Sequence, residues 1–148
     1  MMTCDFEIEG KPVGKGRPRF KRVGNFVQTY TPANTAEYEK LVRLRFQNAG
    51  GVITDKPVRV EIVAFFAPPK STKKRDKAEM LMNKILPKKK PDCDNIAKII
   101  LDALNQIAYK DDSQVAELSV KKRYAAAAKV FVHIEEIEIA GDEIDLAS

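Results

Sequence analysis

Two aspartates separated by one residue, Asp92 and Asp94, stand close behind a run of three lysines, Lys88, Lys89 and Lys90. Carboxylates add nothing to a hydrophobic core, but oxygen ligands of this kind are the ones that Mg²⁺ prefers. Because Mg²⁺ keeps several of its waters, two or three carboxylates are enough to hold it. If the backbone is extended here, both carboxylates point to the same side. The segment therefore predicts a divalent cation held beside a phosphate.

The same residues also have a purely structural interpretation. Asp94 or Asn95 opens the strongest predicted helix, residues 95–108, and aspartate is a favoured helix N-cap. Capping accounts for Asp94. It leaves Asp92 and the neighbouring lysines without an explanation.

A second acidic pair, Asp111 and Asp112, follows the far end of the predicted helix. A helix of about 13 residues is ~20 Å long, so sequence proximity alone does not bring Asp112 to Asp92. The two meet if the chain turns after the helix and the next strand runs back beside it. The alternative is an ordinary aspartate-rich turn.

Lys98 is the predicted cation of the site. It follows Asp94 by four residues, so it lies on the same helical face, and Asp102 follows it by four more. A lysine placed there can stabilise negative charge on a phosphate in the transition state. The alternative is a ladder of surface salt bridges, each contributing only a few tenths of a kcal/mol.

Alternating and helical patterns of apolar residues predict the elements that must position these groups. They predict a single small α/β (α+β) domain with a mixed, mostly antiparallel sheet of about four strands, a small hairpin and about three helices. The strands are expected at residues 3–9, 20–23, 26–30, 57–66, 115–124 and 129–139. The helices are expected at residues 36–48, capped by Thr35, and at residues 73–84 and 95–108. Strand 57–66 is apolar on both faces, which indicates a central position. Residues 1–140 form the expected domain, and residues 141–148 an acidic tail.

Charge is distributed unevenly along the chain. The net charge is +5, but six acids and no cation follow Ile134, and without that segment residues 1–134 carry +11. A strongly basic body favours nucleic acid as the partner.

The remaining composition excludes some chemistries and suggests a compartment. Cys4 and Cys93 are too few for a disulfide framework or a cysteine metal cluster, and one histidine, His133, excludes histidine-rich zinc sites. His133 lies in a strand pattern with the apolar residues Val132 and Ile134, and we expect it to be structural. With no apolar run of membrane-spanning length and no signal-peptide pattern, the expected location is the cytoplasm and no membrane partner is expected.

The pattern D-x-D-N-x-x-K-x-x-x-D-A-L, from Asp92 to Leu104, followed by D-D-x-Q-V from Asp111 to Val115, resembles the RusA-type Holliday junction resolvases. These are small crossover junction endodeoxyribonucleases, often carried by phages and prophages. Residues 14–19 (GKGRPR), together with Tyr30-Thr31-Pro32 and Tyr38-Glu39, are similar to the phage and Gram-positive branch. Some members have arginine just before the first aspartate; here that position is Pro91, and the preceding lysines are expected to supply the charge.

The resemblance implies a homodimer that recognises four-way DNA junctions and cuts them symmetrically with Mg²⁺ or Mn²⁺. The three essential aspartates of the family fall on Asp92, Asp94 and Asp112, with Asp111 as the alternative to Asp112, and its essential lysine falls on Lys98. The expected contacts to the DNA backbone are Lys15, Arg17, Arg19, Lys88, Lys89 and Lys90.

Two alternatives from other classes stay open at this point. One is a non-catalytic nucleic-acid-binding module, in which the acids serve only as cap and turn. The other is a structure-specific nuclease for forks or flaps. A glycosyltransferase, which also uses D-x-D to bind a metal, normally needs a larger nucleotide-binding fold than 148 residues supply.

Overall fold

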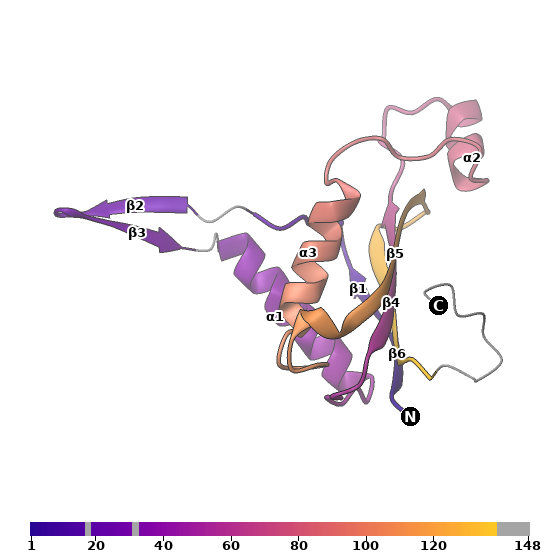
Figure 1. Ribbon diagram of the computed structural model, residues 1–148. Coiled ribbons are helices and arrows are strands. Elements are labelled where there is room, and N and C mark those ends of the chain that lie inside the picture. Colours follow the sequence, from indigo (N-terminus) through magenta and orange to yellow (C-terminus); the bar gives the residue numbers. More distant parts are fainter. Residues whose placement is uncertain (17–18, 31–32, 139–148) are drawn as a thin grey trace, which may run out of the picture.

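The computed structural model describes residues 1–16, 19–30 and 33–138, and it contains a four-stranded sheet with two helices packed on one face (Figure 1). In order across the sheet, the strands are β1 (Thr3–Glu9), β6 (Lys129–Glu136), β4 (Val58–Phe66) and β5 (Val115–Tyr124). Neighbouring strands run antiparallel except β4 and β5, which are parallel. The helices are α1 (Ala33–Asn48), α2 (Lys74–Leu81) and α3 (Cys93–Leu104). The predicted fold class is confirmed.

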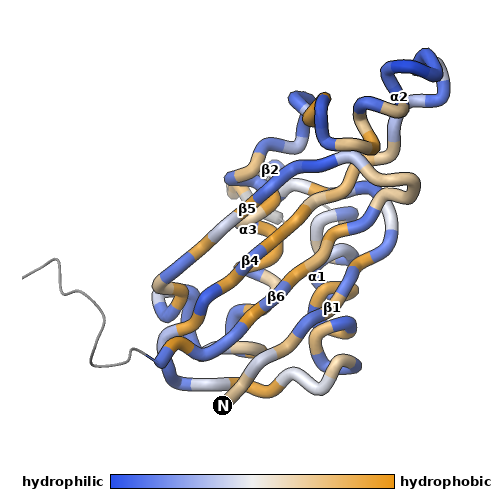
Figure 2. The backbone as a smooth tube through the Cα atoms, turned by 90° about the vertical axis from the view of Figure 1, so that its right-hand side faces the viewer, coloured by the Kyte–Doolittle hydropathy of each residue, from blue (hydrophilic) through white to orange (hydrophobic). Residues whose placement is uncertain are grey.

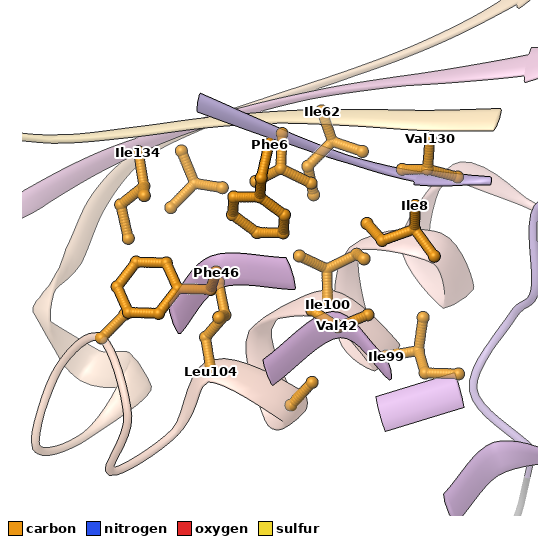
Figure 3. Close-up of a cluster of buried hydrophobic side chains, with 14 of the residues drawn as sticks. Phe6, Ile8, Val42, Phe46, Ile62, Ile99, Ile100, Leu104, Val130 and Ile134 are labelled. Carbon is orange, nitrogen blue, oxygen red and sulfur yellow. The ribbon is translucent and has the colours of Figure 1, made fainter. Parts of the chain in front are cut away.

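The hydrophobic core lies between the sheet and the pair α1 and α3. Alternate side chains of β1, β4 and β6 point to this side, as Figure 3 shows for Phe6, Ile62 and Ile134. Phe6 meets Phe46 of α1 edge to face, with ring centroids 5.9 Å apart. On the helix side, the core includes the apolar stripe of α3, whose buried residues are Ile96, Ile99, Ile100, Ala103 and Leu104. This packing fixes the face that α3 turns to solvent.

The central position predicted for residues 57–66 is also confirmed. β4 is hydrogen-bonded to β6 on one side and β5 on the other. Val63 and Phe65, on the face away from the helices, are half-buried. Figure 2 looks onto that second face, with α1 and α3 behind the sheet.

Three helix boundaries differ from the predictions. α1 begins at Ala33, so Thr35, the predicted cap, is buried inside the helix with 1% exposure. α2 spans only Lys74–Leu81 of the predicted 73–84. α3 begins at Cys93 and ends at Leu104, four residues before the predicted end. The chain turns there because Gln106 adopts a positive φ of 66° and its amide donates to the carbonyl of the fully buried Tyr109 at 2.7 Å.

The predicted hairpin forms from β2 (Arg19–Val23) and β3 (Phe26–Tyr30), which pair only with each other. Gly24 adopts a φ of 58° in its two-residue turn, a conformation that favours glycine. The hairpin extends away from the body of the molecule in Figure 1. Its tip exposes Phe26 and Val27 to solvent, at 78% and 69%. No helix in the described ranges is both long and apolar enough to cross a membrane.

His133 lies on the open face of the sheet, between acids. Asp5, its cross-strand neighbour on β1, is hydrogen-bonded to Nδ1, and Glu135 lies 3.5 Å from Nε2. Glu61 faces His133 from β4, and Arg59 is hydrogen-bonded to Glu135. Partial burial lowers the pKa of His133, but Asp5 and then Glu135 outweigh it, so the pKa is raised overall. These contacts link the imidazole to its neighbours on the sheet, and its structural role stays a prediction.

This environment makes stability depend on pH. A raised folded-state pKa stabilises the protein fully below the unfolded pKa of about 6.5, and the contribution is lost as pH rises through the folded pKa. His133→Gln is expected to lower the free energy of unfolding at about pH 5.5, by no more than about 1 kcal/mol. The same substitution is expected to lower the free energy of unfolding by a smaller amount at about pH 8.5. Urea denaturation of both proteins at the two pH values measures this. An equal cost at both values would contradict it.

Candidate active site

The start of α3 carries Asp92 and Asp94 in two different roles. Asp92 is the N-cap residue, with extended backbone angles, yet its carboxylate makes no capping hydrogen bond. Asp94 is inside the first turn, so the prediction that it or Asn95 opens the helix is wrong by one or two residues. Both acids sit at the positive end of the helix dipole, which stabilises negative charge.

The early start of α3 separates the two carboxylates. Asp92 lines a hollow of about 560 Å³ together with Gly14, Lys15, Lys90, Pro91 and Asn95. Asp94 lines a different hollow, with Lys98 and Asp112. The expectation that an extended segment points both carboxylates the same way is therefore wrong, because the helix rotates Asp94 away from Asp92.

Asp112 returns to α3 through the turn that follows it. The chain reverses, and a single 3₁₀ turn, η1 (Asp112–Gln114), leads into β5 beside α3. Asp94, Lys98, Asp102 and Asp112 then line one pocket of about 320 Å³. Its apolar wall is formed by Ala97, Leu101 and Leu118. Acids 18 residues apart in the sequence, with a lysine between them, thus share one pocket.

The neighbouring carboxylates of Asp111 and Asp112 have different roles, since the first caps a helical turn and the second does not. Asp111 caps η1 by accepting from the Ser113 amide at 3.0 Å, and this hydrogen bond lowers the pKa of Asp111. Gln114 completes a capping box, accepting from the Asp111 amide at 3.2 Å. Its own amide group donates to the carbonyls of Thr54 and Lys56 at 3.0 Å each. No side chain in the described ranges hydrogen-bonds to the Asp112 carboxylate, which lines the pocket instead.

A chain of ion pairs runs beside this pocket. Lys98 Nζ lies 3.2 Å from an Asp102 carboxylate oxygen, and Lys15 Nζ lies 3.2 Å from the same atom and 3.1 Å from Glu39. Partial burial lowers the pKa of Lys15, but Glu39 and Asp102 outweigh it and raise the pKa overall. The contact of Lys15 with DNA stays a prediction; in the structure its ammonium is paired with two acids. The link to Glu39 could not be read from spacing, although the interval of four residues between Lys98 and Asp102 is visible in the sequence.

The glycine before Lys15 brings the basic loop onto the start of α3. The Lys15 amide donates to the Asn95 carbonyl at 2.9 Å. A Cβ on Gly14 would stand 2.8 Å from Pro91 Cβ and 3.1 Å from Asn95 Cβ. These contacts flank Asp92 and leave no room for a side chain.

Gly14→Ala is therefore expected to push the loop off the helix start. The predicted loss of unfolding free energy is about 1–3 kcal/mol, typical of an overpacked site. Urea denaturation measures it. If Gly14→Ala is as stable as the parent protein, the close packing of loop and helix is not as described.

The remaining predicted site residues lie around these hollows or outside the described ranges. Lys88, Lys89 and Lys90 are exposed on the loop that leads to Asp92. Arg19 begins β2, and Arg17 and the acidic segment 141–148 lie outside the described residues. Within the described ranges, no three or more histidine, cysteine, aspartate or glutamate side chains are arranged so that they could together coordinate a metal ion. Three carboxylates line the pocket beside α3: Asp102 is paired with Lys15 and Lys98, whereas Asp94 and Asp112 form no ion pair within the described ranges.

Comparison with known proteins adds two findings. The profile of a family described as "Endodeoxyribonuclease RusA" matches residues 9–135, a span that contains every residue of the two hollows. The chain is also 37% identical over 142 residues to the "Uncharacterized protein YqaN" of Bacillus subtilis (strain 168), covering 92% of this chain and 99% of that protein. The Bacillus relative agrees with the expected phage and Gram-positive branch.

Proposed function

Since this chain belongs to the RusA endodeoxyribonuclease family, we propose that it resolves four-way DNA junctions by metal-dependent hydrolysis of phosphodiesters. One observation carries the proposal: Asp94, Asp112 and Lys98 share a pocket, while the neighbouring Asp111 is occupied as a cap. A binding module that used its acids only for cap and turn would have no need of a free carboxylate at Asp112.

The donor set suits Mg²⁺ or Mn²⁺. The carboxylates of Asp94 and Asp112 offer hard oxygen ligands, and Mg²⁺ typically uses one or two carboxylates together with waters. In our proposal Asp94, Asp112 and Asp92 would hold the ion. A divalent metal here supplies an activated water and neutralises charge on the phosphate.

Lys98 is proposed to stabilise the developing charge on the phosphate. Its side chain is 61% exposed at the rim of the pocket, and its partner Asp102 holds it on the pocket side of α3. Asp102 also pairs with Lys15, so the Lys98 ammonium is not fully neutralised by its own carboxylate. A cation in this position is available to an incoming phosphate.

The basic surface around the site is proposed to hold the DNA backbone. Lys88, Lys89 and Lys90 are exposed and lead into the site, and Arg17 and Arg19 remain predicted contacts. Lys15 is proposed to act as an anchor for the loop, because two acids already neutralise it. Binding through these cations should weaken steeply with salt.

A homodimer completes the proposal. A four-way junction has approximate two-fold symmetry, so a two-fold dimer presents one site to each of two strands. This part rests on the family. A cytoplasmic location, in a bacterium or a phage-infected cell, is proposed with it; both cysteines are free, as is usual in a reducing compartment.

The test compares a four-way junction, a replication fork and a linear duplex of the same sequence, each with Mg²⁺ and with Mn²⁺. We expect symmetric cuts in the junction and none in the duplex. Faster cutting of the fork would favour the fork and flap nuclease. Tight junction binding without cleavage in either metal would favour the non-catalytic binding module.

A further inference from the structure

A third hollow lies beside the one that Asp92 lines. It has a volume of about 310 Å³ and forms where the end of β4 meets the loop before α3 and the turn before β6. We call it the lysine pocket; its lining residues are Lys11, Pro12, Phe66, Ala67, Lys89, Lys90, Pro91 and Ala128. Lys90 and Pro91 also line the Asp92 hollow, so the two hollows are neighbours.

Four ammonium groups gather around this pocket. Lys11, Lys89 and Lys90 line it, and Lys122 joins them from β5 by donating a hydrogen bond to the Lys89 carbonyl. The Nζ atoms of Lys89 and Lys122 lie 5.6 Å and 5.4 Å from the centre of the Phe66 ring, within cation–π range. The pocket thus has an aromatic floor under a group of cations.

The charge of these four lysines is not balanced by carboxylates at the pocket within the described ranges. No aspartate or glutamate lines the pocket, and none forms an ion pair with Lys11, Lys89, Lys90 or Lys122. Like charges held together without counter-charge favour binding of an anion.

We propose that the lysine pocket is a subsite for the sugar–phosphate backbone of the DNA strand, next to the phosphate that is cut. The ammonium groups would contact phosphate, and the apolar surface of Pro12, Phe66 and Pro91 would pack against deoxyribose. The pocket adds Lys11 and Lys122, 111 residues apart, to the DNA-binding surface. This inference rests on the proposed function, because it takes DNA to be the ligand.

The test is a double variant, Lys11→Met with Lys122→Met, which keeps an apolar side chain at each position and removes two charges. Its matched control is Lys40→Met with Lys56→Met, which removes two charges from exposed lysines on α1 and in the loop before β4. Junction affinity is measured by fluorescence anisotropy over a salt series in EDTA, so that cleavage plays no part. Urea denaturation verifies that both variants are folded.

We expect the pocket variant to bind the junction roughly tenfold or more weakly, with the salt slope reduced by about 2, and the control to change far less. Equal losses in both variants would overturn the inference, because only net charge would then matter. Binding of inorganic phosphate that is lost in the pocket variant, with junction affinity unchanged, would make this a small-anion site instead. A change in dimerisation alone, seen by sedimentation, would make it a contact between copies.

Failure of this inference is distinguishable from failure of the proposed function. If the parent protein binds junctions through the pocket but never cuts them, the nuclease proposal fails and the subsite stands. If the parent protein cuts junctions and the pocket variant binds them equally well, only the subsite fails.

Discussion

Asp112→Asn is expected to abolish junction cleavage, by a factor on the order of 10³ or more, while Asp111→Asn leaves it nearly unchanged. Asparagine at position 112 removes one of the two carboxylates of the pocket that are not paired with a lysine, and with it the charge that a divalent cation requires. Asparagine at position 111 still offers an oxygen to the Ser113 amide, and asparagine caps helices about as well as aspartate. The two variants have the same charge and differ by one position.

Single-turnover cleavage of a labelled four-way junction in Mg²⁺ measures both variants, with affinity in EDTA as the companion reading. Junction affinity should persist or rise in Asp112→Asn, because a negative charge has been removed near the DNA. If Asp111→Asn is the inactive variant, Asp111 is the ligand and the division of the pair described above is wrong.

Lys98→Met is expected to reduce the rate of junction cleavage by about 10²-fold, with affinity changed much less. The physical reason is that Lys98 shares the pocket with Asp94 and Asp112, where it would meet the charge that develops on the phosphate. Its ion pair with Asp102 is exposed and spaced i,i+4, so losing it should cost only about 0.3–0.5 kcal/mol of stability.

These two readings separate the catalytic interpretation of Lys98 from the structural one. Lys40→Met, on the exposed surface of α1, is the control for loss of one positive charge. If Lys98→Met cleaves junctions at the parent rate and is only slightly less stable, Lys98 has a structural role alone, as one partner of a surface salt bridge. A much slower variant of nearly full stability supports its place at the phosphate.

The elements that carry clear periodicity could be predicted from sequence. The stripe of Ile96, Ile99, Ile100, Ala103 and Leu104 is helical in spacing, and all five side chains are buried in α3. The apolar character of both faces of β4 indicated its central place in the sheet. The parallel pairing of β4 with β5 cannot be predicted in this way, because alternation within a strand does not identify the neighbouring strand or its direction.

The start of α3 shows why the boundaries of a helix are harder to predict than its presence. Asp92, Asp94 and Asn95 are all favourable caps, so local propensity does not choose among them. Packing of the apolar stripe against the sheet decides the helix position, and the helix begins at Cys93. Because the helix already includes Asp94, Asp94 and Asp92 line different hollows.

The ion pairs of Lys15 could not be predicted from spacing, because they join distant segments. Lys15, Glu39 and Asp102 come from a loop, α1 and α3, and only the folded chain brings their charges within 3.2 Å. The capping role of Asp111 was accessible, because Gln114 follows it at the interval of a capping box. The choice between Asp111 and Asp112 could thus have been argued from sequence.

The most direct test of metal-dependent cleavage at this site uses the unchanged protein. A labelled four-way junction is incubated with it in Mg²⁺ and, in parallel, in excess EDTA, and the formation of nicked duplex is followed. We predict paired, symmetric cuts in Mg²⁺ and none in EDTA. Cleavage that continues in EDTA, or a protein that binds the junction yet cuts it with neither Mg²⁺ nor Mn²⁺, would contradict the assignment of Asp92, Asp94 and Asp112 to a catalytic metal site.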